Sequence, residues 1–131
     1  MIDNILKLLT PKDKVAYLNR NISVRQGLEK FRVHGFNAVP VLNEDGTYFG
    51  TITEGDFLWK IIDDDIVDVE ELEDISIEEI IRKEVKSCKV DVSLNELKEL
   101  IVNNNFVPIV DDRNIFMGII TRKTLINSLI N

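Results

Sequence analysis

The chain has 131 residues, enough for one domain, and 44% of them are hydrophobic, which is ordinary for a soluble globular protein. Its formal net charge of −7 argues against nucleic-acid binding, because phosphate backbones are normally bound by a basic surface. No apolar run reaches the roughly 18–20 residues of a membrane span, the N-terminus indicates no signal peptide, and a single cysteine fits a reducing cytoplasm.

The first half of the chain predicts two helices and three extended segments before a closing helix. A short helix is expected over Asp3–Leu9 and an extended piece over Val15–Leu18. The next helix begins at an S-x-x-Q capping box, Ser23–Gln26, and ends near Gly35, because glycine tolerates the left-handed conformation. Two β-rich runs then flank the polar turn Asn43–Gly46, and an apolar stripe after them marks the closing helix.

An acidic segment follows, since Asp63–Glu79 contains ten acids and no Lys or Arg. A solvated linker is the simpler interpretation of this segment, and an acidic docking surface is the alternative. Its capping box, Ser76–Glu79, predicts a helix over Ile77–Lys83. The aspartates lack the spacing of a calcium loop, so a metal-regulated module is only a distant option and no metal site is expected.

The second half repeats the first. The stretch AVPVLNEDGTYFGTIT (Ala38–Thr53) aligns without a gap with FVPIVDDRNIFMGIIT (Phe106–Thr121), 68 positions further along. Ser93 begins the corresponding helix 70 positions after Ser23, so the second copy lacks two residues at the helix end. There the run Asn103–Asn105 is expected to supply the left-handed conformation. Self-similarity at a fixed spacing indicates two copies of one structural unit.

These elements predict an α/β (α+β) fold made of two βαββα units, packed through a pseudo-two-fold axis with clefts between them. Repeat 1 is assigned to residues 12–62, the acidic linker with its helix to residues 63–83 and repeat 2 to residues 84–131. Neither copy can bury its apolar face alone at this size, so the two are expected to fold as one module over residues 1–131.

The ordered set of motifs, found twice, resembles the CBS domain, and its tandem arrangement resembles a CBS pair, or Bateman module. The pieces Lys14–Tyr17, Gly35–Pro40 and Gly118–Lys123 look most like the stand-alone bacterial two-CBS proteins that bind cyclic di-AMP or AMP. The resemblance implies a regulatory module, not an enzyme, that binds an adenine nucleotide between its repeats and signals to an unidentified target protein. It also implies a homodimer and no required cofactor.

The resemblance implies two clefts, each built from both repeats. In cleft one the first copy would frame the adenine, while the second copy would bind phosphate through a helix N-terminus and two basic side chains. Thr124 stands where the family has a ribose-binding Asp, which favours a phosphate-rich ligand such as a cyclic dinucleotide. The residues assigned to cleft one are Lys14, Val15, Ala16, Tyr17, Asn37, Ala38, Val39, Ile120, Thr121, Arg122 and Lys123.

Cleft two keeps the family's acid, Asp56, which could accept hydrogen bonds from ribose hydroxyls. The acid Glu54 near the phosphate position and the bulky Phe106 make it the weaker anion site. The residues assigned to cleft two are Lys86, Cys88, Lys89, Phe106, Val107, Ile52, Thr53 and Asp56.

Plainer interpretations of the same residues stay open. The pair Thr53 and Asp56 also fits a simple capping box, Cys88 fits a small apolar filler, and His34 fits a helix C-terminus. Trp59, Phe57, Leu125 and Leu129 are candidate dimer contacts. The sequence shows no nucleophile motif or metal-ligand cluster, and the alternative to a nucleotide sensor is a ligand-free dimerisation or protein-interaction module.

Overall fold

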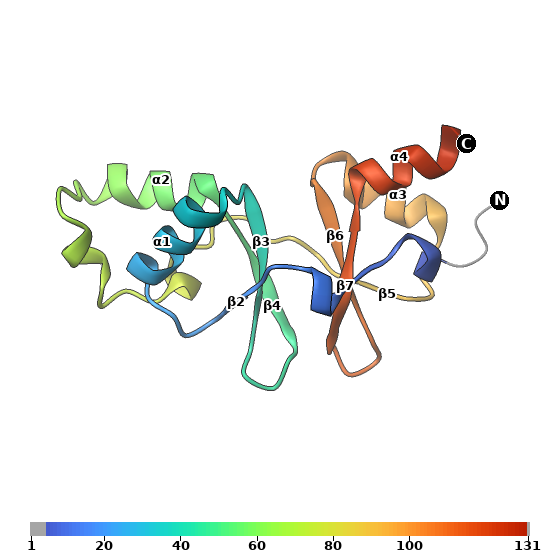
Figure 1. Ribbon diagram of the computed structural model, residues 1–131, viewed down its shortest axis with the longest axis horizontal. Helices are drawn as coiled ribbons and strands as arrows, with labels where there is room; N and C mark the ends of the chain where they lie inside the picture. The colour runs from blue at the N-terminus through green and yellow to red at the C-terminus, as the bar shows by residue number, and fades with distance from the viewer. Residues whose placement is uncertain (1–4, 131) are drawn as a thin grey trace. The chain divides into compact units, whose positions relative to one another are not determined.

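The computed structural model describes residues 5–130, which form two compact units (Figure 1). The first unit contains residues 17–44 and 49–84, and the second contains residues 5–16, 45–48 and 85–130. The units therefore do not follow the chain in order, because the N-terminal segment and the tip of the first β-hairpin belong with the C-terminal repeat. The assignment of repeats and linker to residues 12–62, 63–83 and 84–131 stays a prediction.

The first unit is a three-stranded sheet with helices packed against it (Figure 1). The strand order is β2-β3-β4, and β2 is parallel to β3. Residues from the sheet, both helices and the linker share one apolar core. Its elements are β2 (Leu18–Asn19), α1 (Val24–His34), β3 (Ala38–Leu42), β4 (Tyr48–Thr53, of which Tyr48 belongs to the second unit) and α2 (Glu54–Asp63).

Local sequence explains where α1 begins and ends. Ser23 Oγ accepts from the Gln26 N–H at 3.0 Å, and Gln26 Oε1 accepts from the Ser23 N–H at 2.9 Å. At the other end Gly35 adopts the left-handed conformation (φ 66°, ψ 35°), and its N–H donates to Phe31 O at 2.8 Å. An N-cap such as Ser23 contributes about 1 kcal/mol to helix stability. The predicted start and end of this helix are confirmed.

The acidic segment is packed onto the first unit. Leu72 and Ile77 are fully buried in its core, and each contributes roughly 1.5–3 kcal/mol by leaving water. The segment contains two short 3₁₀ helices, η3 (Val69–Leu72) and η4 (Ile77–Glu79). The helix predicted over Ile77–Lys83 is therefore wrong beyond its first turn. Most of the segment's acidic side chains are exposed to solvent, as are Val67 and Val69.

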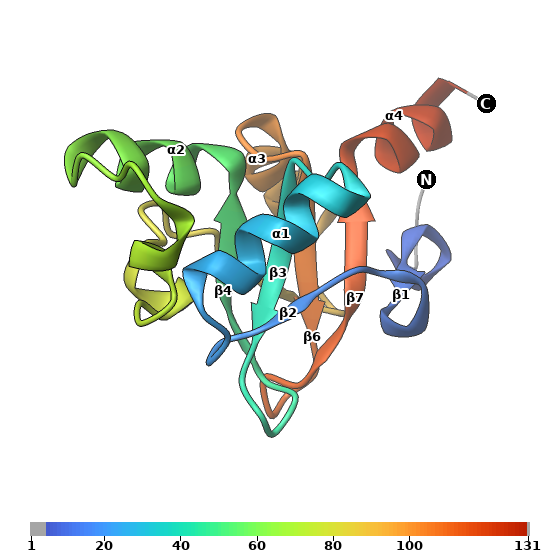
Figure 2. The same ribbon diagram turned by 60° about the vertical axis from the view of Figure 1, so that its left-hand side comes forward.

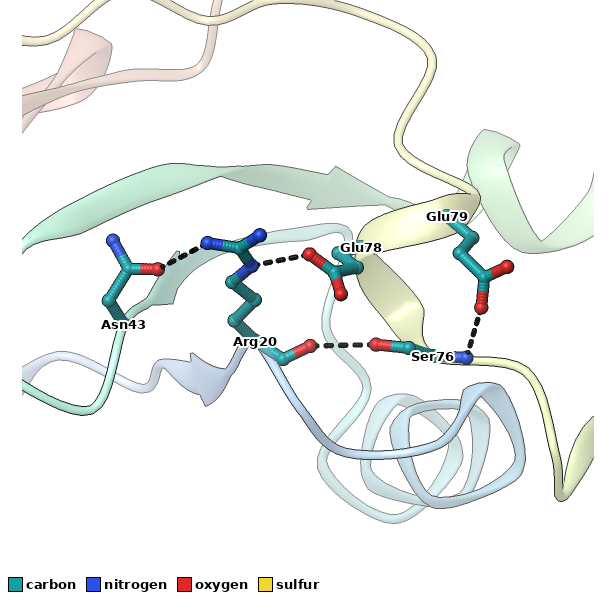
Figure 3. A network of polar contacts seen from close by, with 5 residues as sticks. All are labelled: Arg20, Asn43, Ser76, Glu78 and Glu79. Carbon is teal, nitrogen blue, oxygen red and sulfur yellow. Dashed lines mark hydrogen bonds and ion pairs between the residues drawn. The ribbon is translucent and has the colours of Figure 1, made fainter.

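A polar network holds the end of the acidic segment against β2 and β3 (Figure 3). The Arg20 guanidinium pairs with Glu78 and donates to Asn43 Oδ1 at 3.1 Å, while Ser76 Oγ donates to Arg20 O at 2.9 Å. The Arg20 guanidinium also lies 4.3 Å from the ring centroid of Phe49. Because these partners are far apart in sequence, the network was not predictable from local patterns.

The second unit is a four-stranded sheet of order β1-β7-β6-β5 (Figures 1 and 2). Its core joins the sheet to helices from both ends of the chain. Of the helix predicted over Asp3–Leu9, the described part is one 3₁₀ turn, and Asp3 lies outside the described residues. The elements are η1 (Ile5–Leu8), β1 (Thr10–Pro11), η2 (Lys12–Lys14), β5 (Cys88–Lys89), α3 (Leu94–Val102), β6 (Phe106–Val110), β7 (Phe116–Thr121) and α4 (Arg122–Ile130).

The N-terminal strand extends this sheet by pairing with β7. Thr10 lies opposite Ile119 and Pro11 opposite Gly118, antiparallel, so β1 covers the edge of β7 (Figure 2). Gly118 has φ 151°, and a Cβ there would overlap the Thr10 carbonyl and lie 3.0 Å from Pro11 Cα. Glycine at this position is therefore required by the close approach of two strands.

The tip of the first hairpin is hydrogen-bonded to the second. Thr47 and Ile115 form an antiparallel bridge, the Tyr48 N–H donates to Asn114 O at 3.0 Å and Tyr48 Oη donates to Val85 O at 2.8 Å. Asn114 holds a left-handed conformation (φ 67°), which asparagine tolerates in a turn. Among residues 5–130 no helix is long and apolar enough to cross a bilayer.

Candidate functional site

Both closing helices start beside the residue that precedes the Pro-containing strand of the same repeat. The Glu54 N–H at the start of α2 donates to Asn37 O at 3.0 Å, and the Arg122 N–H at the start of α4 donates to Asn105 O at 2.9 Å. In each repeat the residues predicted to frame an adenine therefore lie next to the start of the helix predicted to meet ribose and phosphate. The sequence assigns those two sets to different clefts.

In repeat 1 the residues predicted to frame the adenine differ in how far their side chains are exposed. Asn37 is exposed and Ala38 half-buried, but the Val39 side chain is buried in the core of the first unit. The preceding segment is more open: Lys14, Ala16 and Tyr17 are exposed.

The strand expected over Val15–Leu18 is short. Regular β2 pairing begins only at Leu18, although the Val15 backbone is extended (φ −111°, ψ 132°). An extended backbone can still offer N–H and C=O groups to an adenine edge.

The start of α4 is capped by its own threonines. Thr121 Oγ1 accepts from the Thr124 N–H at 3.1 Å and donates to Thr124 Oγ1 at 2.8 Å. With the Arg122 N–H bonded to Asn105 O, two of the first three helical N–H groups have partners inside the chain. Lys123 is exposed at this end of the helix. Thr121 therefore caps α4, and its contact with a ligand stays a prediction.

Arg122 is engaged with the preceding helix. Its guanidinium donates to Ile101 O at 3.1 Å, to Val102 O at 3.2 Å and to Asn104 O at 3.1 Å, at the C-terminal end of α3. A cation there satisfies carbonyls that the helix leaves unpaired and complements its dipole. The role assigned to Arg122 from sequence, a phosphate contact, would have to compete with these three hydrogen bonds.

The end of α3 explains why Arg122 is needed. The left-handed conformation predicted for Asn103–Asn105 is wrong: Asn103 has φ −103° and ψ 1°, and none of the three residues has positive φ. Asn104 instead donates its side-chain amide to Leu100 O at 2.8 Å. The second repeat lacks the two residues that bring Gly35 into place in the first, so side chains satisfy the carbonyls instead.

In cleft two the predicted ribose acid is buried and already hydrogen-bonded. Asp56 is 4% exposed; its Oδ2 accepts from the Thr53 N–H at 2.8 Å and its Oδ1 from the Arg82 N–H at 3.1 Å. Thr53 Oγ1 in turn accepts from the Asp56 N–H at 3.4 Å. The capping-box interpretation is confirmed, and backbone donors satisfy the buried carboxylate.

The second-repeat residues of cleft two divide between core and surface. Cys88, Phe106 and Val107 are buried, whereas Lys86 is exposed and Lys89 pairs with Asp112 at 3.7 Å. Burial raises the pKa of the Cys88 thiol from its ordinary 9.0 to about 11, with a smaller contribution from Glu96. Cys88 is therefore an apolar filler, as its sequence context indicates.

Several residues assigned to the clefts cannot sandwich an adenine ring with their side chains. Ile52, Ile120 and Val107 are at most 1% exposed, and each packs in the core of a unit or beside it. The strand pairing places Val107 opposite Ile120 and Phe106 opposite Thr121. These positions can contribute only backbone groups or shape to a ligand site, which a linear motif does not reveal.

His34 and Trp59 lie outside the assigned ligand sites. His34 is the last residue of α1, as predicted from sequence, and its ring stacks on Phe36 with the ring centroids 5.1 Å apart. Trp59 is 47% exposed, with the Arg82 guanidinium 5.4 Å from its ring centroid. Within residues 5–130 no group of three or more His, Cys, Asp or Glu side chains is arranged to hold a metal ion.

The chain belongs to the CBS domain family. The family's model, described as CBS domain, matches residues 5–63 and 77–131. Cyclic di-AMP receptor B of Bacillus subtilis (strain 168) is 25% identical over 117 residues, covering 89% of this chain and 80% of that protein.

Solved structures share the fold. A crystal structure of CbpB in complex with c-di-AMP has a TM-score of 0.87 at 24% identity, covering 97% of this chain and 84% of that one. CbpB from Streptococcus agalactiae has a TM-score of 0.83 at 26% identity, covering 93% and 77%. The predicted family and the α/β tandem CBS fold are confirmed.

Proposed function

We propose that this chain is a regulatory ligand-sensing module that binds an adenine nucleotide, with cyclic di-AMP as the first candidate, and signals to a partner protein. The observation that carries the proposal is its similarity, over 89% of its length, to a protein named as a cyclic di-AMP receptor. The CbpB structure with c-di-AMP, which has the same fold, supports it. AMP is the second candidate, because CBSX2 has been solved with AMP at a TM-score of 0.75.

The nucleotide is proposed to bind to the residues of cleft one. The extended backbone at Val15 and in the β3 residues Ala38 and Val39 offers donors and acceptors for the adenine edge, and the exposed Tyr17 and Asn37 side chains can contact the ligand. The start of α4 supplies a positive dipole end for a phosphate. Lys123 is the better placed of the two basic side chains there, because Arg122 already bonds three carbonyls.

Thermal melts with AMP, ADP, ATP, cyclic di-AMP, cyclic di-GMP and S-adenosylmethionine test the ligand class. A ligand at 100 times its Kd stabilises the folded chain by about 2.7 kcal/mol, which is a rise in Tm of several degrees at this size. Lys123→Ala should reduce the shift, while Lys98→Ala, an exposed lysine on α3, should not. Absence of a shift with every adenine compound would reject the proposal.

The module is proposed to act by binding and not by catalysis. A ligand regulates a partner only if it has different affinities for two states of the module. Cyclic di-AMP recovered intact after long incubation with the chain would agree, and turnover to a linear product would not. The single unpaired cysteine supports a cytoplasmic location.

A homodimer is proposed through the closing helices. The sequence predicts Phe57 and Leu125 as dimer contacts. That prediction is wrong for these two residues, because both side chains are buried in the cores.

The closing helices leave several large apolar side chains exposed. An apolar groove of about 350 Å³ lies beside α1 and α2, with Phe31 and Phe57 on its wall and Arg32 and Glu54 among its polar residues. The large apolar side chains left exposed on α2 and α4 are Leu58, Trp59, Ile62, Ile126, Leu129 and Ile130.

A ligand-free interaction module is the second candidate. The observation that favours it is the engaged Asp56 carboxylate, together with Thr124 at the corresponding position of repeat 2. Under this alternative the dimer would form, and none of the nucleotides would shift the melt.

A further inference from the structure

The N-terminus of α2 is joined to the far end of the acidic linker through one buried side chain. Asp56 Oδ1 accepts from the Arg82 N–H at 3.1 Å, across 26 positions of sequence. Its other oxygen bonds the Thr53 N–H, and the residue is 4% exposed. Both oxygens are therefore directed to backbone donors of the chain itself.

The linker is packed against the first unit just before Arg82 and at the Arg82 side chain itself. Ile80 is 5% exposed and lies in the core of the first unit, and a Cβ on Gly50 would meet Ile81 Cδ1 at 3.7 Å. The Arg82 guanidinium lies over the Trp59 ring and 3.9 Å from Asp63. The Arg82 N–H is thus held against the carboxylate by packing as well as by its own bond.

The hydrogen bond between Asp56 and Arg82 lies at the wall of a polar cavity of about 300 Å³ in the first unit. Asp56 and Arg82 are on its wall, together with Trp59, Lys60 and Glu79. Because Asp56 is only 4% exposed and its carboxylate already accepts from the Arg82 N–H, a ribose could reach it only by displacing the linker at Arg82. That displacement would also disturb Ile80 and Ile81, which lie just before Arg82.

The corresponding position in repeat 2 works differently. Thr124 bonds to Thr121 in its own turn, through its N–H and its hydroxyl oxygen. Asp56, unlike Thr124, therefore bonds a backbone N–H of the linker as well as one in its own turn. A ligand contact is not needed to explain it.

We infer that Asp56 is a positioning residue that fastens the linker at Arg82, so that the second cleft lacks a free acid for ribose and the chain takes up nucleotide at one site. The part concerning nucleotide rests on the proposed function. The part concerning the linker does not.

Amide hydrogen exchange followed by NMR on the ligand-free chain tests the linker contact. The Arg82 amide should be protected in the wild type and exchange about tenfold faster in Asp56→Asn, since the hydrogen bond loses its charged acceptor. Thr53→Ala is the matched control: it removes the hydroxyl cap but keeps the Thr53 N–H, and should leave Arg82 exchange within about twofold. Equal Arg82 exchange in wild type and Asp56→Asn would overturn the inference.

The wild type alone supplies a second test, which needs no variant to fold. On saturation with AMP or cyclic di-AMP, Arg82 should keep its protection and calorimetry should give one nucleotide per chain. Release of the Arg82 amide on binding, or two equivalent sites, would overturn the inference. If the wild type binds no nucleotide, the proposed function fails, while the ligand-free exchange experiment still decides the role of Asp56.

Discussion

At position 118 a single missing Cβ decides how closely β1 can approach β7. Gly118→Ala should lower the free energy of unfolding by about 2 kcal/mol or more. Alanine is strained at the positive φ of this position, and its Cβ would overlap the Thr10 carbonyl. Gly50→Ala is a matched control at the same position of repeat 1, where the nearest atom is 3.7 Å away. Urea unfolding of both variants measures the difference, and equal losses would contradict this account of β1.

The buried Cys88 thiol gives a pH dependence of stability. Its pKa is raised from 9.0 to about 11 on folding, so the folded state retains the proton more tightly between these values. Stability should therefore be intact below about pH 9 and fall as the pH rises toward 11. Comparing unfolding of wild type and Cys88→Ala across this range isolates the effect, because other groups titrate equally in both. Parallel curves would exclude the thiol as the cause.

Side-chain contacts between residues close in sequence were predictable, and contacts between distant residues were not. Ser23 and Thr53 were predictable as helix caps because both partners of each bond lie within three residues. The sequence predicts a phosphate contact for Arg122, because basic residues at a helix start fit that role. Its contacts with carbonyls 18–21 positions earlier depend on tertiary structure, which a local pattern cannot show.

At the scale of elements, α3 depends on a side chain from α4 for its C-terminal end. Arg122→Ala should reduce stability by about 1–3 kcal/mol, since three carbonyls lose a charged donor. Arg122→Lys should recover only part of this, because an ammonium cannot reproduce the planar fork. Lys123→Ala should be nearly neutral. Thermal unfolding of the three variants without ligand is the measurement, and a neutral Arg122→Ala would contradict the cap.

Long, strongly patterned elements were predictable, and short or non-local ones were not. The helices α1–α4 and the strands β3, β4, β6 and β7 follow from apolar periodicity and turn residues. The linker helix shortens to η4, because Ile77 and Ile80 are fixed by the core of the first unit and not by helical spacing. The pairing of β1 with β7 joins segments about a hundred residues apart, and sequence periodicity carries no information on it.

At the scale of the molecule, the exposed apolar residues of α2 and α4 predict self-association. Leu58→Glu and Leu129→Glu together should give a monomer, because each places a charge where an apolar contact is proposed. Light scattering after size exclusion gives the mass directly. Val33→Glu is a control on an exposed residue of α1 outside the closing helices. A dimer that persists in the double variant would place the interface elsewhere.

Adenine nucleotide binding is the central claim, and titration calorimetry of the wild-type chain with cyclic di-AMP tests it most directly. The account predicts saturable binding at one nucleotide per chain, competition by AMP and no binding of cyclic di-GMP. The absence of binding by either adenine nucleotide, in a chain shown to be folded by its cooperative melt, would contradict it and favour the ligand-free interaction module.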